Sequence, residues 1–148
     1  MTPLADSVRE RLQPLIGLRL SASYRAADMR VFHFGTMRKV GNGAVGEFAL
    51  HVQCPWRIQA KDRIVTSRHD LFDPAEVTED FDWKSWDWDG NETLQDKLVS
   101  EFLEEKKPTV EAILTDTCGG ATLNLSGGYE LVLFPAGTKS EDWRGGKG

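Results

Sequence analysis

Tryptophan and aspartate alternate in one short stretch of the chain, residues 80–91, which holds three of the five tryptophans and four aspartates. Tryptophan is enriched among the residues that dominate binding energy at protein interfaces, and carboxylates attract basic surfaces. One hypothesis is therefore a contact surface for a basic protein partner, made by Asp82, Trp83, Trp86, Asp87 and Trp88. The alternative is structural: Trp83 and Trp86 pack on the core as loop anchors, while Trp88 stays among solvated acids.

A second set of residues has the chemistry to bind a small anion. Arginine pairs with carboxylates or phosphates, and a tryptophan ring offers a face on which a guanidinium group stacks. Gathered around one concavity, the set would form a binding module, or an enzyme, for a small anionic ligand. Its members are Trp56, Arg57, Arg68, His69, Asp70 and Arg144. The alternative is that Trp56 and Trp143 anchor the core or a sheet edge. The neighbouring Arg57 and Arg144 then stack on the rings or pair with carboxylates of the acidic loop.

Oxygen ligands at alternate positions are typical of calcium loops, and Asp87, Asp89 and Asn91 have that spacing. The rest of such a loop is missing, because Gly90 is one position too early and Leu98 stands where a bidentate glutamate would close the site. Capping of a following helix by Asp89 explains the same residues more simply. We therefore predict no metal site.

The histidines and nucleophiles form no recognisable catalytic pattern. His33, His51 and His69 lie on or beside different predicted strands, without the spacing that converges histidines on zinc. Combining Cys54 or Ser67 with a histidine and an acid would be arbitrary, because such triads are defined by geometry. We predict no cofactor and assign no catalytic residue. Whether the chain is an enzyme stays open, and the balance favours a protein that is not.

Charge is distributed unevenly along the chain. Residues 1–68 hold 11 Lys/Arg and 5 Asp/Glu, whereas residues 69–92 hold 1 and 9. The remaining residues, 93–148, hold 6 and 9, and the whole chain has a net charge of −5. Because the basic half contains no run of lysine or arginine, we expect pairing of opposite charges within the fold and no nucleic-acid partner.

Several features of the sequence favour the cytoplasm. No apolar run approaches the roughly 18 residues that span a bilayer, and the first residues lack the pattern of a secretion signal. The two cysteines, Cys54 and Cys118, lie in or beside apolar strand patterns, where free thiols behave as small hydrophobes. We expect both thiols to be reduced and buried, and we expect a cytoplasmic protein without membrane association.

The first half of the chain reads as a short N-terminal helix ending at Pro14, followed by strands. Apolar residues recur at every second position from Ile16 to Tyr24, which is typical of a half-buried strand. Further strands are predicted at residues 29–34, 43–54, 56–58 and 64–67.

The second half is predicted as a long loop, a helix and a three-stranded meander. Residues 69–90 have no hydrophobic period and form the loop. An amphipathic helix follows near residues 90–107, with Asp89 and Glu92 interpreted as its capping box and Pro108 as its stop. The meander strands are predicted at residues 110–117, 121–125 and 129–134.

Three pieces of the sequence stand out as short motifs: Gln53-Cys54-Pro55-Trp56-Arg57-Ile58, Ser67-Arg68-His69-Asp70, and Leu133-Phe134-Pro135 with Trp143-Arg144. In these motifs, and from about Ile16 to Arg144, the chain resembles a family of small uncharacterised bacterial proteins. The resemblance implies a bacterial source. It supplies no catalytic residue, because that family has no established function.

These patterns predict one α+β domain, residues 1–144, with a flexible glycine-rich tail, residues 145–148. We expect mainly antiparallel sheet in two strand groups, arranged as a sandwich or an open barrel. The favoured function is that of a non-enzymatic bacterial cytosolic protein acting through protein–protein contacts, as an accessory or inhibitor-like partner. The alternative is the binding module or enzyme for a small anionic ligand. The oligomeric state is not predicted.

Overall fold

The computed structural model describes residues 4–136 and 143–147, in which two antiparallel sheets surround the main core. The 4-stranded sheet has the spatial order β1 (Leu20–Ala26), β2 (Met29–Phe34), β5 (Phe48–Val52) and β11 (Trp143–Lys147). The 5-stranded sheet has the order β7 (Ile64–Ser67), β6 (Trp56–Gln59), β10 (Tyr129–Leu133), β9 (Ala121–Leu125) and β8 (Val110–Thr115). Every strand pair is antiparallel, as the alternation of apolar residues predicts.

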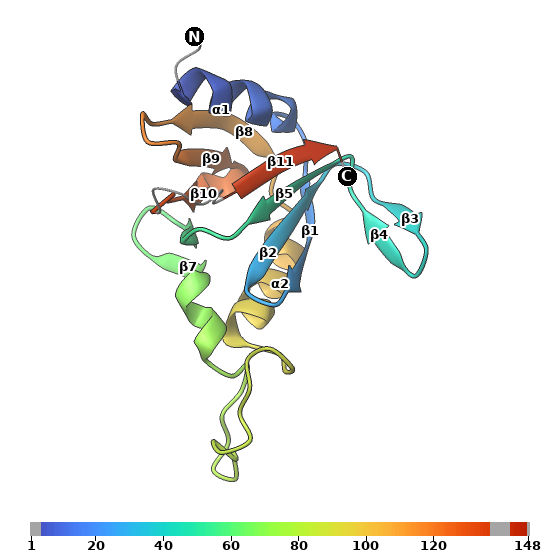
Figure 1. Cartoon of the computed structure of the whole chain (residues 1–148), viewed down its shortest axis with the longest axis vertical. Coiled ribbons are helices and arrows are strands. Elements are labelled where there is room, and N and C mark those ends of the chain that lie inside the picture. Colours follow the sequence, from blue (N-terminus) through green and yellow to red (C-terminus); the bar gives the residue numbers. More distant parts are fainter. Residues whose placement is uncertain (1–3, 137–142, 148) are drawn as a thin grey trace.

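Two helices and a separate hairpin complete the fold (Figure 1). The chain begins with α1 (Leu4–Leu12) and the short turn η1 (Gln13–Leu15), and α2 (Leu94–Lys106) lies between the two strand groups in sequence. Short turns η2 (Arg68–Phe72) and η3 (Ser126–Gly128) follow β7 and β9. The hairpin of β3 (Arg38–Val40) and β4 (Gly43–Val45) projects from the 4-stranded sheet. The predicted α+β class, with an N-terminal helix and a second helix, is confirmed.

The two sheets are joined by backbone hydrogen bonds near the start of β1. Gly17 N donates to Val110 O at 2.8 Å, and Val110 N donates to Leu18 O at 2.9 Å. The chain itself makes a second connection where β5 leads into β6, and the bond from Phe134 N to Pro55 O at 2.9 Å extends the β6–β10 ladder to that point. Pro55 offers no amide donor of its own, so the chain bends there and passes from one sheet to the other.

Side chains from both sheets meet in one hydrophobic core. Phe32 and Leu50 come from the 4-stranded sheet, and Ile58, Leu123 and Leu131 come from the 5-stranded sheet; all five are 0% exposed. The helices add the buried residues Val8 and Leu12 of α1 and Val99, Phe102 and Leu103 of α2. Burial of this apolar surface is the main driving force for the fold.

Helix α2 starts later than its predicted cap. The capping box is formed by Thr93 and Asp96: Thr93 Oγ1 accepts from Asp96 N at 3.1 Å, and Asp96 Oδ2 accepts from Thr93 N at 3.0 Å. The predicted box of Asp89 and Glu92 was therefore one turn too early. Asp89 and Thr93 are both capping residues followed three positions later by a carboxylate. The backbone bridge Pro74↔Thr93 fixes the chain at Thr93, so the helix begins after that residue.

Two further predictions about the strands were wrong, and so was the expected burial of both cysteines, because Cys54 is buried but Cys118 is exposed. Residues 16–19 do not extend β1, because Gly17 has a φ of +89° and breaks the extended backbone. Residues 43–54 are split into β4 and β5. Part of the segment expected to be a flexible tail lies in a strand: Gly145, Gly146 and Lys147 end β11, and they pair with β5. The glycines suggested fraying, but backbone pairing with a neighbouring strand needs no side chain. Gly148 lies outside the described residues.

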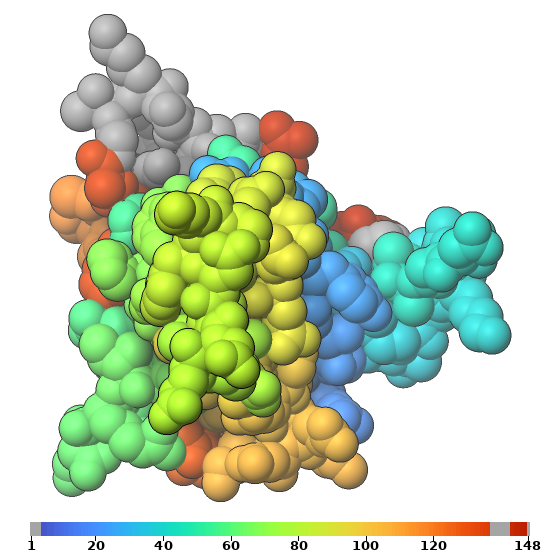
Figure 2. Space-filling model, turned by 90° about the horizontal axis from the view of Figure 1, so that it is seen from below, coloured from blue at the N-terminus to red at the C-terminus, as the bar shows by residue number. Residues whose placement is uncertain are grey.

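Residues 73–92 connect η2 to α2 and form the acidic aromatic loop. Figure 1 shows this segment projecting beyond the sheets, and Figure 2, seen from below, shows it in front of the body of the molecule. It contains neither helix nor strand, as predicted, but residues 69–72 of the predicted loop belong to the short turn η2. Among the described residues, no helix combines the length and the apolar character needed to cross a membrane.

Candidate functional site

The base of the acidic aromatic loop is held by Arg25, which lies on β1. Its Nη2 atom donates to the backbone oxygens of Trp88 at 2.9 Å and Asn91 at 3.1 Å. Its Nε atom donates to Asp96 Oδ1 at 3.0 Å. One arginine therefore joins the 4-stranded sheet, the end of the loop and the start of α2, using the several donors that a guanidinium group presents in fixed geometry.

Arg30 of β2 extends this network into the interior. Arg30 is 2% exposed, and its Nη2 donates to Gln95 Oε1 at 2.7 Å and to Asp96 Oδ1 at 2.5 Å. Gln95, 1% exposed, in turn donates through Nε2 to the backbone oxygen of Arg68 at 3.2 Å. Each of these buried polar side chains thus has a partner, which offsets the cost of removing it from water.

Asp96 is the common acceptor of both arginines. Burial on its own would raise the pKa of Asp96, but hydrogen bonds from Arg25, from the Thr93 backbone and from Arg30 outweigh it and lower that pKa to about 2. Burial also lowers the pKa of Arg30, and the hydrogen bond and charge of Asp96 oppose this. The carboxylate stays ionised at neutral pH, so the connection between loop, sheet and helix keeps its charge-assisted hydrogen bonds.

The sequence analysis missed this network. One signal was present, because Arg30 alternates with Phe32 and Phe34 and therefore lies on the core-facing side of β2. A charged residue at such a position requires a buried partner. Nothing in the sequence pattern indicated that the partner would be Asp96, since the two residues are 66 positions apart.

The two ends of the loop are also tied to each other. Leu94 N donates to Asp73 O at 2.8 Å, and Ala75 N donates to Glu92 O at 3.3 Å. Together with the Arg25 contacts, these bonds close the loop at its base. The loop therefore projects from the molecule with its base held by hydrogen bonds, and its middle residues lie at the surface.

Two of the loop tryptophans serve as anchors. The Trp86 Nε1 atom donates to the backbone oxygen of Phe72 at 3.0 Å, and the Trp88 ring meets the Phe72 ring edge-on at a centroid distance of 6.4 Å. Both tryptophans are half-buried. Trp86 and Trp88 therefore attach the loop to η2, whereas the structural alternative expected Trp83 and Trp86 to pack on the core.

Trp83 is 58% exposed. Its ring meets Phe81 edge-on at a centroid distance of 4.7 Å, and Phe81 lies 6.1 Å from Trp86. The three rings form a small aromatic cluster that lies outside the main core. Exposed tryptophan rings are frequent binding anchors at protein interfaces, because the ring has a large apolar area.

Asp82 and Asp87 shape the turns of the loop while staying exposed. Asp82 Oδ1 accepts from Lys84 N at 3.0 Å, and Asp87 Oδ1 accepts from Asp89 N at 3.0 Å. Such side-chain to backbone bonds are typical of aspartate in turns. The calcium-like spacing of Asp87 and Asp89 thus belongs to a turn, and in the described part of the chain no three His, Cys, Asp or Glu side chains gather as a metal site requires.

The residues of the predicted anion site lie in different surroundings. Trp56 is 2% exposed and packs edge-on against Phe32 in the core, with the ring centroids 5.3 Å apart. Arg57 lies on the other face of β6, where its guanidinium carbon is 4.9 Å from the centre of the Phe134 ring. Because successive strand residues point to opposite faces, Trp56 and Arg57 cannot line one cavity. Arg144 is exposed on β11, in the other sheet.

The remaining three residues, Arg68, His69 and Asp70, share the turn η2. Arg68 Nη2 lies 3.2 Å from Asp28 Oδ2, and Asp70 Oδ2 accepts from Thr66 Oγ1 at 2.9 Å. His69 is exposed. These contacts hold η2 against its neighbours, and the burial of Trp56 and the position of Arg57 over the Phe134 ring agree with the structural alternative.

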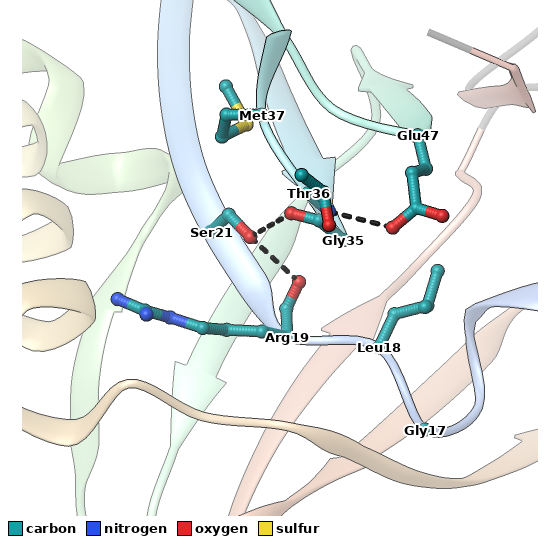
Figure 3. A pocket seen from close by; sticks show the side chains of 8 residues that line it. All are labelled: Gly17, Leu18, Arg19, Ser21, Gly35, Thr36, Met37 and Glu47. Carbon is teal, nitrogen blue, oxygen red and sulfur yellow. Dashed lines mark hydrogen bonds between the residues drawn. The ribbon is translucent and has the colours of Figure 1, made fainter.

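Figure 3 shows a cavity of about 470 Å³ that the sequence analysis did not predict, between residues 17–21 and the base of the β3–β4 hairpin. Its polar groups are occupied by one another. Ser21 Oγ lies 2.5 Å from Gly35 O, and Glu47 Oε2 accepts from Thr36 N at 2.7 Å. The Arg19 side chain extends away from these groups. This arrangement braces the hairpin and leaves no convergent polar groups for a ligand among the described residues that line it.

Comparison of the chain with protein-family models, with curated proteins and with solved structures gives no match. The resemblance to a bacterial family therefore stays a prediction. The acidic aromatic loop, with its fixed base and its exposed tryptophan, is the candidate site.

Proposed function

We propose that this chain is a non-enzymatic protein-binding domain whose acidic aromatic loop docks on a basic surface of a protein partner. The proposal includes a bacterial cytosolic setting, in which the chain acts as an accessory or inhibitor-like partner. The observation that carries it is the 58% exposure of Trp83 on a loop that hydrogen bonds hold at its base. A rigid exposed aromatic residue loses little conformational entropy on binding and is a frequent interface anchor.

The charge around Trp83 supports a basic partner. Residues 73–92 contain eight acidic residues and one lysine, Lys84. Glu76 forms an ion pair with Lys97 of α2, but the N–O distance is long, at 3.8 Å, and the Glu76 side chain is 77% exposed. The loop therefore presents a negative field that attracts and orients a positively charged surface, and rising salt weakens that attraction.

The proposal is tested by affinity capture with three versions of the full chain: wild type, Trp83→Ala and Ile64→Ala. Ile64 is a matched control because it is 57% exposed on β7, away from the loop. Wild type and Ile64→Ala should retain the same basic protein from a lysate of the source organism, with retention falling as salt is raised. Trp83→Ala should retain at least about tenfold less, as expected for an interface hot spot. Equal retention of every protein by all three versions would contradict the proposal.

A further inference from the structure

A cavity of about 280 Å³ opens beside the aromatic cluster of the acidic aromatic loop. Phe81 and Trp86 supply aromatic rings to its lining, and Glu76, Asp82 and Glu92 supply carboxyl groups. The acids come from the beginning, middle and end of the loop, so folding of the loop brings their charges to one opening. The sequence analysis included Asp82 and Trp86 in the contact surface but did not place them in a cavity.

Several hydrogen bonds hold the walls of this cavity in place. Trp86 is held through its Nε1 bond to Phe72 O at 3.0 Å, and its backbone N donates to Trp83 O at 3.4 Å. Two further lining residues are joined by the bond from Ala75 N to Glu92 O at 3.3 Å. A preformed cavity binds a ligand without first losing loop entropy.

The lining selects for a cation that also has a flat apolar face. Aromatic rings attract cations through their negative faces, and carboxylates add charge-assisted hydrogen bonds. Guanidinium meets both demands because it is planar, is always charged and donates in a fork that matches a carboxylate. Lys97 approaches the rim through its 3.8 Å contact with Glu76, but this pair is too exposed and too long to neutralise the opening.

We infer that this cavity receives an arginine side chain of the protein partner, with the guanidinium group stacked on Phe81 or Trp86 and hydrogen-bonded to Asp82 or Glu92. The inference rests on the proposed function and specifies the partner residue that the loop recognises. Trp83, outside this cavity, then covers the apolar surface beside the bound arginine.

The test uses two short peptides that differ only in charge: acetyl-Gly-Arg-Gly-amide and the same peptide with citrulline, the neutral analogue of arginine. Binding to the full chain is followed by NMR through the indole N–H of Trp86, and the buried indole of Trp143 serves as an internal control. The arginine peptide should shift the Trp86 resonance saturably and bind about tenfold more tightly than the citrulline peptide. Equal binding of both peptides, or no binding of either, would overturn the inference.

Charge-removing variants locate the peptide. Asp82→Asn combined with Glu92→Gln should weaken the arginine peptide by about fivefold or more, since the asparagine side chain keeps an oxygen for the turn while the charge is lost. The matched control is Glu111→Gln, which removes one charge from an exposed position on β8. Similar affinity in the double variant and in the control would show that the peptide binds elsewhere and would overturn the inference.

Failure of the inference can be distinguished from failure of the proposed function. If Trp83→Ala loses a partner in the capture experiment while the peptide test is negative, the loop binds a protein but the cavity does not take arginine. If the peptide binds at Trp86 while Trp83→Ala retains every captured protein, the cavity is a guanidinium site and the proposed docking surface is wrong.

Discussion

Trp56 and Trp83 both lie in short polar and aromatic stretches of sequence, but they occupy opposite environments. Trp56 is 2% exposed inside the core, whereas Trp83 is 58% exposed on the acidic aromatic loop. The difference follows from the backbone around each residue. β6 alternates between a core face and a solvent face, so Trp56 is buried with Ile58, while the loop has no such period and no sheet to cover it. Residue type alone therefore did not separate a structural anchor from a binding surface.

The largest expected effect is a difference in stability between variants of these two tryptophans. Trp56→Ala should lower the free energy of unfolding by about 3–5 kcal/mol, because it leaves a large cavity in the core. Trp83→Ala should change it by no more than about 0.5 kcal/mol, because the side chain is exposed. Urea denaturation of both variants measures the difference. A comparable loss of unfolding free energy for Trp83→Ala would mean that the aromatic cluster supports the fold. The contrast between a structural Trp56 and a surface Trp83 would then be wrong.

The second prediction concerns Asp96, which connects the loop to the sheet. Asp96→Ala should lower the free energy of unfolding by about 3 kcal/mol, because it leaves the buried Arg30 without its carboxylate and removes half of the capping box. Glu104→Ala, an exposed acid on the same helix, is the control and should change stability by less than about 0.5 kcal/mol. Equal effects in urea denaturation would show that the network adds nothing to stability.

The third prediction is a loss of stability in two steps as the pH falls. Burial, with a smaller effect of His51, lowers the pKa of His33 below 6.5, so the unfolded chain takes up this proton first and stability falls below pH 6.5. Asp96 has a pKa of about 2 against an ordinary 3.8, so its contribution is complete above pH 3.8 and is lost as the pH falls towards 2.

The size of the second step is about 2 kcal/mol from the Asp96 pKa difference. Urea denaturation at a series of pH values measures both steps. His33→Asn should flatten the first step, in which protonation breaks the bond from Gly46 N to His33 Nδ1, and Asp96→Asn should flatten the second. Unchanged pH profiles in the two variants would contradict the assignment.

Among the variants expected to destabilise the fold, Arg25→Gln should have the smallest effect on the free energy of unfolding, at about 1 kcal/mol. Its local effect should be larger, because Arg25 holds the backbone of Trp88 and Asn91. Hydrogen exchange measured by mass spectrometry should become about tenfold faster in residues 86–92 and stay unchanged in β6. Arg9→Gln on the exposed face of α1 is the control. Equal acceleration in the loop and in β6 would mean that the base of the loop and the core do not behave as separate regions.

Much of the fold was predictable because it depends on local patterns. The periods of two and of about 3.6 indicated the strands and the amphipathic helix, and the glycine turns indicated the meander of β8, β9 and β10. Boundaries were less predictable. Asp89 and Thr93 are both good capping residues, and the choice of Thr93 depended on the bridge to Pro74, which local sequence does not show.

The candidate site was predictable in composition but not in arrangement. Three tryptophans among aspartates indicated an unusual surface, and the loop that carries them was identified from its lack of period. Trp86 became an anchor because its indole N–H meets Phe72 O, a contact across 14 residues, while the Trp83 ring packs only along the loop and stays exposed. The predicted anion site also depended on arrangement, and Trp56 and Arg57 cannot share a cavity because they point to opposite faces of one strand.

The sequence by itself determined the elements of this protein: which segments extend, which segment coils into α2, and where charge and tryptophan concentrate. These follow from backbone preferences and hydrophobic periods, which act between near neighbours. Only the tertiary structure decided that Arg25 and Arg30 meet Asp96, that Gly145 and Gly146 complete a sheet, and that Phe81, Trp86 and three acids line one cavity. Those outcomes depend on burying polar groups with partners distant in the chain, and the packing of the whole molecule selects those partners.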